Sequence, residues 1–143
     1  MGDAVSTLIK IKFENIKFKQ IFDQSKFIDN FDLCNFSNLN SILNTIKPDI
    51  IINAAGITIR RGIEADKSQT ILVNSALPHI LNQWINLNNN TRLIHFSTDC
   101  VFSGLKGNYN EKSIIDATDF YGKTKGLGEV NNNRVLTLRS SMI

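Results

Sequence analysis

A chain of 143 residues is long enough for one domain with a buried core and short for two. Apolar residues make up 42%, charged residues 20%, and the net charge is +3, a composition typical of a soluble globular protein. The basic residues are scattered, no apolar run reaches the ~20 residues that cross a bilayer, and the N-terminus lacks the basic-then-apolar order of a secretory signal. We therefore expect a cytoplasmic domain that binds neither nucleic acid nor a membrane.

The residues that most often bind metals are too dispersed to form a site. Cys34 and Cys100 show no metal-type spacing, and His79 and His95 have no cluster of carboxylates or thiols around them. Two reduced thiols are a simpler account of the cysteines than a disulfide in a cytoplasmic protein. The sequence predicts no metal centre.

The first thirty residues fit two structures. Thr7–Phe13 and Ile16–Phe22 alternate in a way that is typical of a hairpin, whereas Met1–Lys10 equally fits a short helix. Periodicity does not separate these alternatives. Beyond them, apolar residues recur at helical spacing and predict an amphipathic helix over Phe36–Lys47.

The remaining elements alternate between strands and helices. The β-branched run Ile50–Ile52 predicts a strand buried on both faces of a parallel sheet. A helix follows over about 65–87, which Pro78 is expected to bend or split. The last three elements are a strand over Arg92–Ser97, a helix over about Phe120–Glu129 after a loop, and a strand over Val135–Arg139.

This order predicts an α/β fold with a doubly wound parallel sheet. In such sheets a ligand binds beyond the carboxyl ends of the strands. Those ends carry small and polar residues, at Asn53–Gly56, Ser97–Asp99 and Ser140–Ser141. The sequence therefore places the candidate site at this edge.

Tyr121 and Lys125 are the strongest candidates for chemistry. They lie four residues apart on a predicted helix and so share a face. A nearby ammonium group stabilises a phenolate, which lowers the tyrosine pKa and suits proton transfer. Ser97–Asp99 lies at the carboxyl end of a predicted strand, and a hydroxyl there would help to orient a carbonyl oxygen. On spacing alone, an exposed Tyr–Lys pair and a capping threonine are simpler interpretations.

Several motifs in the same order identify a family resemblance. They are His95–Gly104, Tyr109–Glu111, Tyr121–Lys125 and Gly128–Glu129, preceded by Lys47–Asp49, Asn53–Gly56 and Val73–Asn74. Over about residues 30–143 the chain resembles the dTDP-4-dehydrorhamnose reductases, extended short-chain dehydrogenases that reduce a nucleotide-linked 4-keto sugar. The resemblance implies a Rossmann-like domain that binds NADPH or NADH.

The resemblance also implies roles for individual residues. Tyr121 would be the catalytic acid, Lys125 would bind the nicotinamide ribose and lower the tyrosine pKa, and Thr98 would hold the keto oxygen. Asn74 would support the lysine through water. The remaining cofactor-binding residues would be Gly2, Asp32, Leu33, Asn53, Ala54, Ala55 and Gly56.

The chain departs from the family pattern at both ends. The family opens with a strand and a Gly-x-x-Gly-x-x-Gly turn, of which only Gly2 is matched here as the third glycine. We therefore expect residues 1–143 to be a partial NAD(P)-binding domain that lacks the first strand and the C-terminal substrate-binding part. Gly2–Lys10 would then be helical beside a distorted sheet centre, unless Leu8–Phe13 replaces the missing strand.

The expected function is NAD(P)H-dependent reduction of a nucleotide-linked 4-keto-6-deoxy sugar. Two alternatives stay open at this point: a non-catalytic regulatory subunit similar to that of methionine adenosyltransferase, and a related sugar-nucleotide epimerase or dehydratase. The expected partner is a nucleotide sugar, and a homodimer is a candidate assembly.

Overall fold

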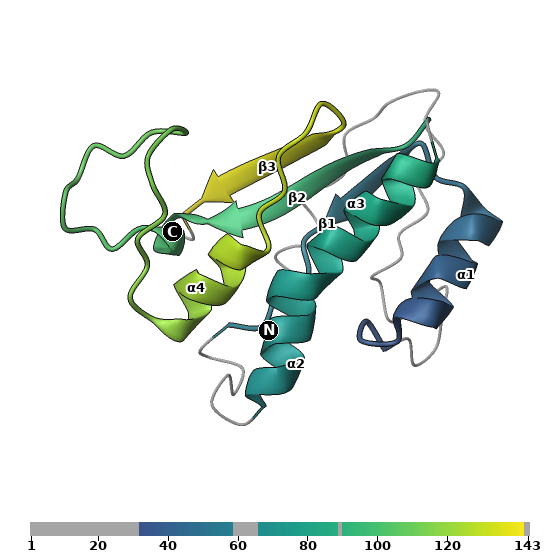
Figure 1. Cartoon of the computed structure of the whole chain (residues 1–143), viewed down its shortest axis with the longest axis horizontal. Helices are drawn as coiled ribbons and strands as arrows, with labels where there is room; N and C mark the ends of the chain where they lie inside the picture. Colours follow the sequence, from purple (N-terminus) through teal and green to yellow (C-terminus); the bar gives the residue numbers. More distant parts are fainter. Residues whose placement is uncertain (1–31, 59–65, 89, 142–143) are drawn as a thin grey trace.

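The computed structural model describes residues 32–58, 66–88 and 90–141 as a parallel sheet with its connecting helices (Figure 1). In chain order the elements are α1 (Phe36–Ile46), β1 (Ile50–Asn53), α2 (Lys67–Ile71), the π-helical turn η2 (Leu72–Ala76), α3 (Leu77–Leu87), β2 (Arg92–Thr98), the 3₁₀ turn η3 (Asp99–Val101), α4 (Phe120–Leu127) and β3 (Val135–Ser140). Each element predicted from residue 36 onward is present, so the α/β prediction is confirmed.

The sheet contains three parallel strands in the order β1-β2-β3. Ile51 lies opposite Leu93, and Ile94 lies opposite Leu136. Within the described ranges the second edge of β1 has no strand partner. The expectations for Gly2, for a helix or hairpin near the N-terminus and for a substitute strand concern residues outside these ranges, and they stay predictions.

A side-chain cap and a left-handed residue followed by proline set the two ends of helix α1. The Asn35 side chain accepts a hydrogen bond from the Asn38 backbone N–H, which caps the first turn. Lys47 takes a left-handed conformation with φ 46°, and its N–H donates to the Leu43 carbonyl. Because Pro48 disfavours helical backbone at the residue before it, the chain leaves the helix there and enters β1.

The helix continues through Pro78, but the hydrogen bonds just before it change from the α-helical to the wider π-helical pattern. Residues 67–87 run through α2, η2 and α3 without interruption, and the Leu77 N–H donates to the Leu72 carbonyl in the wider π-type bond. Proline has no N–H, so it cannot bond the carbonyl of Asn74 four residues earlier. A Cβ added to Gly128 would lie 2.0 Å from that carbonyl oxygen, so only glycine permits this approach. The expected disturbance at Pro78 is thus a π turn that contacts the end of α4.

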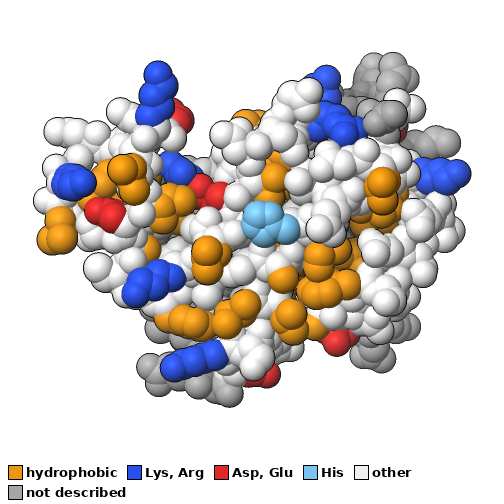
Figure 2. Space-filling model, viewed as in Figure 1, with side chains coloured by type: hydrophobic (Ala, Val, Ile, Leu, Met, Phe, Trp, Pro, Cys, Tyr) orange, Lys and Arg blue, Asp and Glu red, His pale blue; other side chains and the backbone are white. Residues whose placement is uncertain are grey.

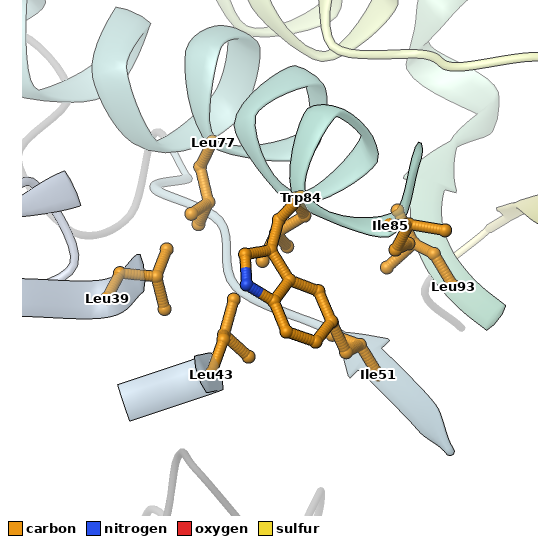
Figure 3. Packing of buried hydrophobic residues seen from close by; sticks show 8 residues of the cluster. Leu39, Leu43, Ile51, Leu77, Trp84, Ile85 and Leu93 are labelled. Atoms are coloured by element: carbon orange, nitrogen blue, oxygen red, sulfur yellow. The ribbon is translucent and has the colours of Figure 1, made fainter. Parts of the chain in front are cut away.

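An apolar cluster fills the space between α1, α3 and the first two strands (Figure 3). Its buried members are Leu39, Leu43, Ile51, Leu77, Leu81, Trp84, Ile85 and Leu93. The Trp84 ring lies between Leu43 and Ile51 in Figure 3, and its indole N–H donates to Asn44 Oδ1 at 2.8 Å. The buried aromatic ring therefore keeps a partner for its one polar atom.

The described helices α1, α3 and α4 lie on the same side of the sheet (Figure 1). The opposite face is apolar and partly exposed at Phe96, Leu136 and Leu138. None of the described helices is both long enough and apolar enough to span a bilayer.

Candidate active site

Lys125 is a buried lysine at the centre of the site. Its side chain is only 4% exposed, and Nζ donates a hydrogen bond of 2.7 Å to the carbonyl of Phe96 on β2. Burial lowers the pKa of Lys125 to about 8, while the carboxylate of Glu129 raises it in part. The ammonium has three N–H groups, and the structure gives one of them a protein partner.

Tyr121 lies one turn before Lys125 on α4 and is half-buried. Burial raises the pKa of Tyr121 and is the largest effect; the Thr98 side chain lowers it, and negative charge at Cys100, Asp99 and Asp119 raises it further. The expectation that Lys125 lowers this pKa is wrong for the described structure. The physical reason is that the ammonium is directed at the Phe96 carbonyl, whereas acidic groups surround the phenol.

Thr98 ends β2 and is buried beside Tyr121. Its hydroxyl accepts from the Cys100 N–H at 3.2 Å and donates to Asp99 Oδ1 at 3.2 Å, so Thr98 also caps η3. The structure therefore brings Thr98, Tyr121 and Lys125 together at the carboxyl end of β2, as the sequence predicts. The capping role considered as the simpler alternative is present as well.

The segment that follows β1 also approaches Lys125. A Cβ added to Gly56 would lie 3.8 Å from Lys125 Nζ and 3.7 Å from Asn74 Oδ1. Ala54 is exposed, and Ala55 packs against the apolar cluster. Gly56, the last residue of the segment 53–56 that the family resemblance assigns to a cofactor, thus lies beside the buried ammonium group.

Asn74 holds that segment from the helical side. Its Oδ1 accepts from the Ile57 N–H at 2.8 Å, and its Nδ2 donates to the Ile57 carbonyl at 3.0 Å and to Thr124 Oγ1 at 3.2 Å. Asn74 is fully buried in the π turn η2. Its direct partners are therefore the Ile57 backbone and α4; the water-mediated support of Lys125 stays a prediction.

Two further predicted residues lie before α1. Asp32 Oδ1 accepts from the Cys34 N–H at 2.8 Å, and Leu33 packs against the apolar cluster. No hydrogen bond within the described ranges links either residue to Thr98, Tyr121 or Lys125. Their assignment as cofactor-binding residues, like that of Gly2, remains a prediction.

Sequence reasoning missed a charged group beside the lysine. Glu129 Oε1 accepts a hydrogen bond from the Ser97 hydroxyl at 2.6 Å. Arg139 on β3 donates to the Glu129 carboxylate through two nitrogens, at 2.7–3.1 Å. These bonds lower the pKa of Glu129 although burial raises it. The spacing of four from Lys125 is the signal that was available in the sequence, since it places a carboxylate near the lysine. Glu129 also ties the ends of β2 and β3 together.

Across the described ranges there is no group of three metal-ligating side chains. In Figure 2 the basic side chains lie apart from one another on the visible face, and the hydrophobic ones form separate groups. The view shows no basic patch of the kind that binds nucleic acid.

Comparison with known proteins assigns the chain to a family. The family model described as "RmlD substrate binding domain" matches residues 8–143. The chain belongs to this family. One relative is the dTDP-4-dehydrorhamnose reductase of Aggregatibacter actinomycetemcomitans, which is 33% identical over 130 residues, or 90% of this chain and 42% of that reductase.

Solved structures of the family share the fold. The crystal structure of a hypothetical dTDP-4-dehydrorhamnose reductase from Sulfolobus tokodaii matches with a TM-score of 0.73 and 32% identity, over 82% of this chain and 44% of that one. The Bacillus anthracis reductase in complex with NADP matches with a TM-score of 0.69 and 26% identity, over 78% and 41% of the two chains. These matches confirm the Rossmann-like fold. The chain spans less than half the length of these relatives.

Proposed function

We propose that this protein takes part in the NAD(P)H-dependent reduction of a nucleotide-linked 4-keto-6-deoxy sugar, with Tyr121 as proton donor. The observation that carries the proposal is the meeting of Thr98, Tyr121 and Lys125 with the segment after β1 at one edge of the sheet. The family relatives named above are reductases of this class, and this supports the same chemistry here.

The residues present fit a nicotinamide cofactor. Gly56 carries no side chain where the backbone passes Lys125, and the buried ammonium retains donors for ribose hydroxyls. Such a cofactor would supply the hydride. Asn53–Gly56 would lie along it and Lys125 would bind its ribose. NADP is the cofactor in the Bacillus anthracis complex, and for this chain both NADPH and NADH stay candidates.

Tyr121 carries the proton that its proposed role requires. Burial raises the pKa of the phenol, so the group is protonated at neutral pH, but it is a weaker acid than a free tyrosine until a bound substrate and cofactor change its surroundings. Thr98 would hold the keto oxygen close to that proton. The phenolate that forms when the proton leaves would later regain a proton from solvent.

Replacing Tyr121 by Phe tests the proposal. We expect kcat for a dTDP-4-keto-6-deoxy sugar to fall by roughly 10²–10⁴, because the positioned acid is lost, with cofactor affinity little changed. NADPH consumption measured with the purified protein gives the rate. The matched control is Tyr109→Phe, since Tyr109 bonds Ser103 and Lys106 in the loop away from Lys125. An unchanged kcat in Tyr121→Phe would refute the proton-donor role.

The two alternatives have less support. The relatives that the chain resembles carry reductase names, and nothing in the described site favours a regulatory subunit or an epimerase over a reductase. A homodimer and a cytoplasmic location remain predictions, to be checked by analytical ultracentrifugation and by cell fractionation.

A further inference from the structure

Asn53 and His95 form a fully buried polar pair between two neighbouring strands. They lie opposite each other in the register of β1 and β2, and both have an exposed fraction of 0%. Asn53 Nδ2 lies 3.1 Å from His95 Nδ1, and Asn53 Oδ1 accepts from the Ala55 N–H at 3.1 Å. One side chain thus joins the histidine to the segment that passes Lys125.

The side-chain hydrogen bonds of Asn53 favour one tautomer of His95. Because the Asn53 oxygen already accepts from Ala55, the amide nitrogen must face the imidazole, and it can only donate. His95 Nδ1 is therefore the acceptor, and the ring proton sits on Nε2, which has no partner within the described part of the chain. The imidazole must be neutral to accept in this way.

The surroundings keep the imidazole neutral. Burial lowers the pKa of His95 to about 4, and the charge of Lys125 on α4 lowers it as well. Glu129 and the backbone of Asn53 raise it in part, and His79 on α3 lowers it slightly. At neutral pH, Nδ1 therefore keeps the lone pair that the Asn53 amide needs.

We infer that His95 is a positioning residue whose Nδ1 orients the Asn53 amide and so sets the backbone at Ala55. The inference rests on the proposed function only for the meaning of this segment as a cofactor contact. The segment is held at two points by independent asparagines: Asn53 at the Ala55 N–H, and Asn74 at the Ile57 N–H. Only the first of these points depends on His95.

Two substitutions at His95 distinguish the role of its hydrogen-bond acceptor from the role of its side-chain volume. His95→Leu keeps a large apolar side chain but removes the acceptor, whereas His95→Asn is smaller but offers an amide oxygen near the position of Nδ1. If the acceptor matters, Asn should preserve the segment better than Leu. If only filled volume matters, Leu should be the better replacement. The two explanations therefore predict opposite rankings.

Amide hydrogen exchange of the ¹⁵N-labelled chain measures the effect directly. We expect exchange at Ala55 to speed up tenfold or more in His95→Leu and by less than about threefold in His95→Asn. The Ile57 amide should be unaffected in both, because Asn74 still holds it. Equal acceleration at Ala55 and Ile57, or Leu outperforming Asn, would overturn the inference.

Nitrogen NMR of the histidine ring adds a direct signature. We expect Nδ1 of His95 to resonate as an unprotonated nitrogen and Nε2 as a protonated one at neutral pH; the reverse tautomer would refute the inference. Neither measurement requires activity. A chain with the expected exchange pattern that binds no NADPH or NADH would contradict the proposed function and leave the positioning role of His95 standing.

Discussion

The interior between the sheet and its helices has two regions of opposite chemistry. Between α1, α3 and the middle of the strands, the buried side chains form the apolar cluster. Around η2, α4 and the carboxyl ends of β1 and β2, most of the buried side chains are polar, although Val73 and Val101 are buried there as well. The polar ones are Asn53, Asn74, Ser75, His95, Ser97, Thr98, Thr124 and Lys125. The same sheet face thus changes from a dry core to a bonded polar site along the length of β2.

The difference shows which region stabilises the fold and which one costs stability. Burial of apolar area contributes about 25 cal/mol per Å², whereas a buried polar group at best recovers its lost hydration through hydrogen bonds. In the polar region the recovery is nearly complete, since Ser75, for example, donates to the Thr124 carbonyl at 2.8 Å. Lys125 and His95 are the members whose ionisation burial opposes. A protein keeps such groups where they act on a ligand.

The largest stability effect should come from the apolar region. Leu81→Ala should lower the free energy of unfolding by about 2–5 kcal/mol, because Leu81 is a member of the apolar cluster with 1% exposure and its truncation leaves a cavity. Leu87→Ala on the same helix is the matched control; at 85% exposure it should cost under about 0.5 kcal/mol. Urea unfolding measures both, and similar losses in the two variants would contradict the assignment of the core.

The polar region should respond to pH. The pKa of His95 is about 4 in the folded chain and near its usual 6.5 in the unfolded one, so the unfolded chain binds more protons between these values. Stability from this group is therefore complete above pH 6.5 and is lost as pH falls toward 4. At about 1.4 kcal/mol per pH unit, the loss is on the order of 3 kcal/mol.

Urea unfolding at a series of pH values gives this slope. His95→Leu is the control and should flatten the curve between pH 6.5 and 4. The carboxylates of Asp116 and Glu129, whose pKa values are lowered from usual values of 3.8 and 4.5, lose their contribution from about pH 4.5 downward, at and below the acid end of this window. A wild-type curve that is already flat there would show that His95 is not kept neutral by burial.

The two regions also differ in how far the sequence predicts them. The apolar cluster follows from helical spacing and from the run Ile50–Ile52, because one repeating pattern specifies both the element and its buried face. In the polar region, spacing identifies Tyr121 and Lys125, but it does not give their partners. The Lys125 bond to the Phe96 carbonyl spans 29 residues, and that between Asn53 and His95 spans 42.

Such long-range pairs leave no periodic signal, and this explains the errors. The pKa of Tyr121 was assigned the wrong direction because its acidic neighbours and its burial are set by η3 and the start of α4 packing together. His95 looked like an isolated histidine because its partner belongs to another strand. The close approach of Gly128 to the π turn joins residues some fifty positions apart. Each of these features requires the assembled fold.

The smallest predicted effect is a gain in folding stability, in a variant that should at the same time lose the proposed function. Lys125 has a pKa of about 8 in the folded chain and near 10.5 when unfolded, so at neutral pH its buried charge costs stability. Lys125→Met keeps the length of the side chain and removes that charge, but it also loses the bond to the Phe96 carbonyl. We therefore expect a net gain of about 1 kcal/mol at pH 7 together with loss of the proposed reduction.

Wild-type stability should rise between pH 8 and 10.5, where the unfolded chain holds the additional proton, and the variant should lack this rise. Lys123→Met, an exposed lysine on the same helix, is the matched control and should change stability by under about 0.5 kcal/mol. A clear loss of stability in Lys125→Met would mean that the ammonium stabilises the polar region. It would contradict the conclusion that burying this charge costs stability.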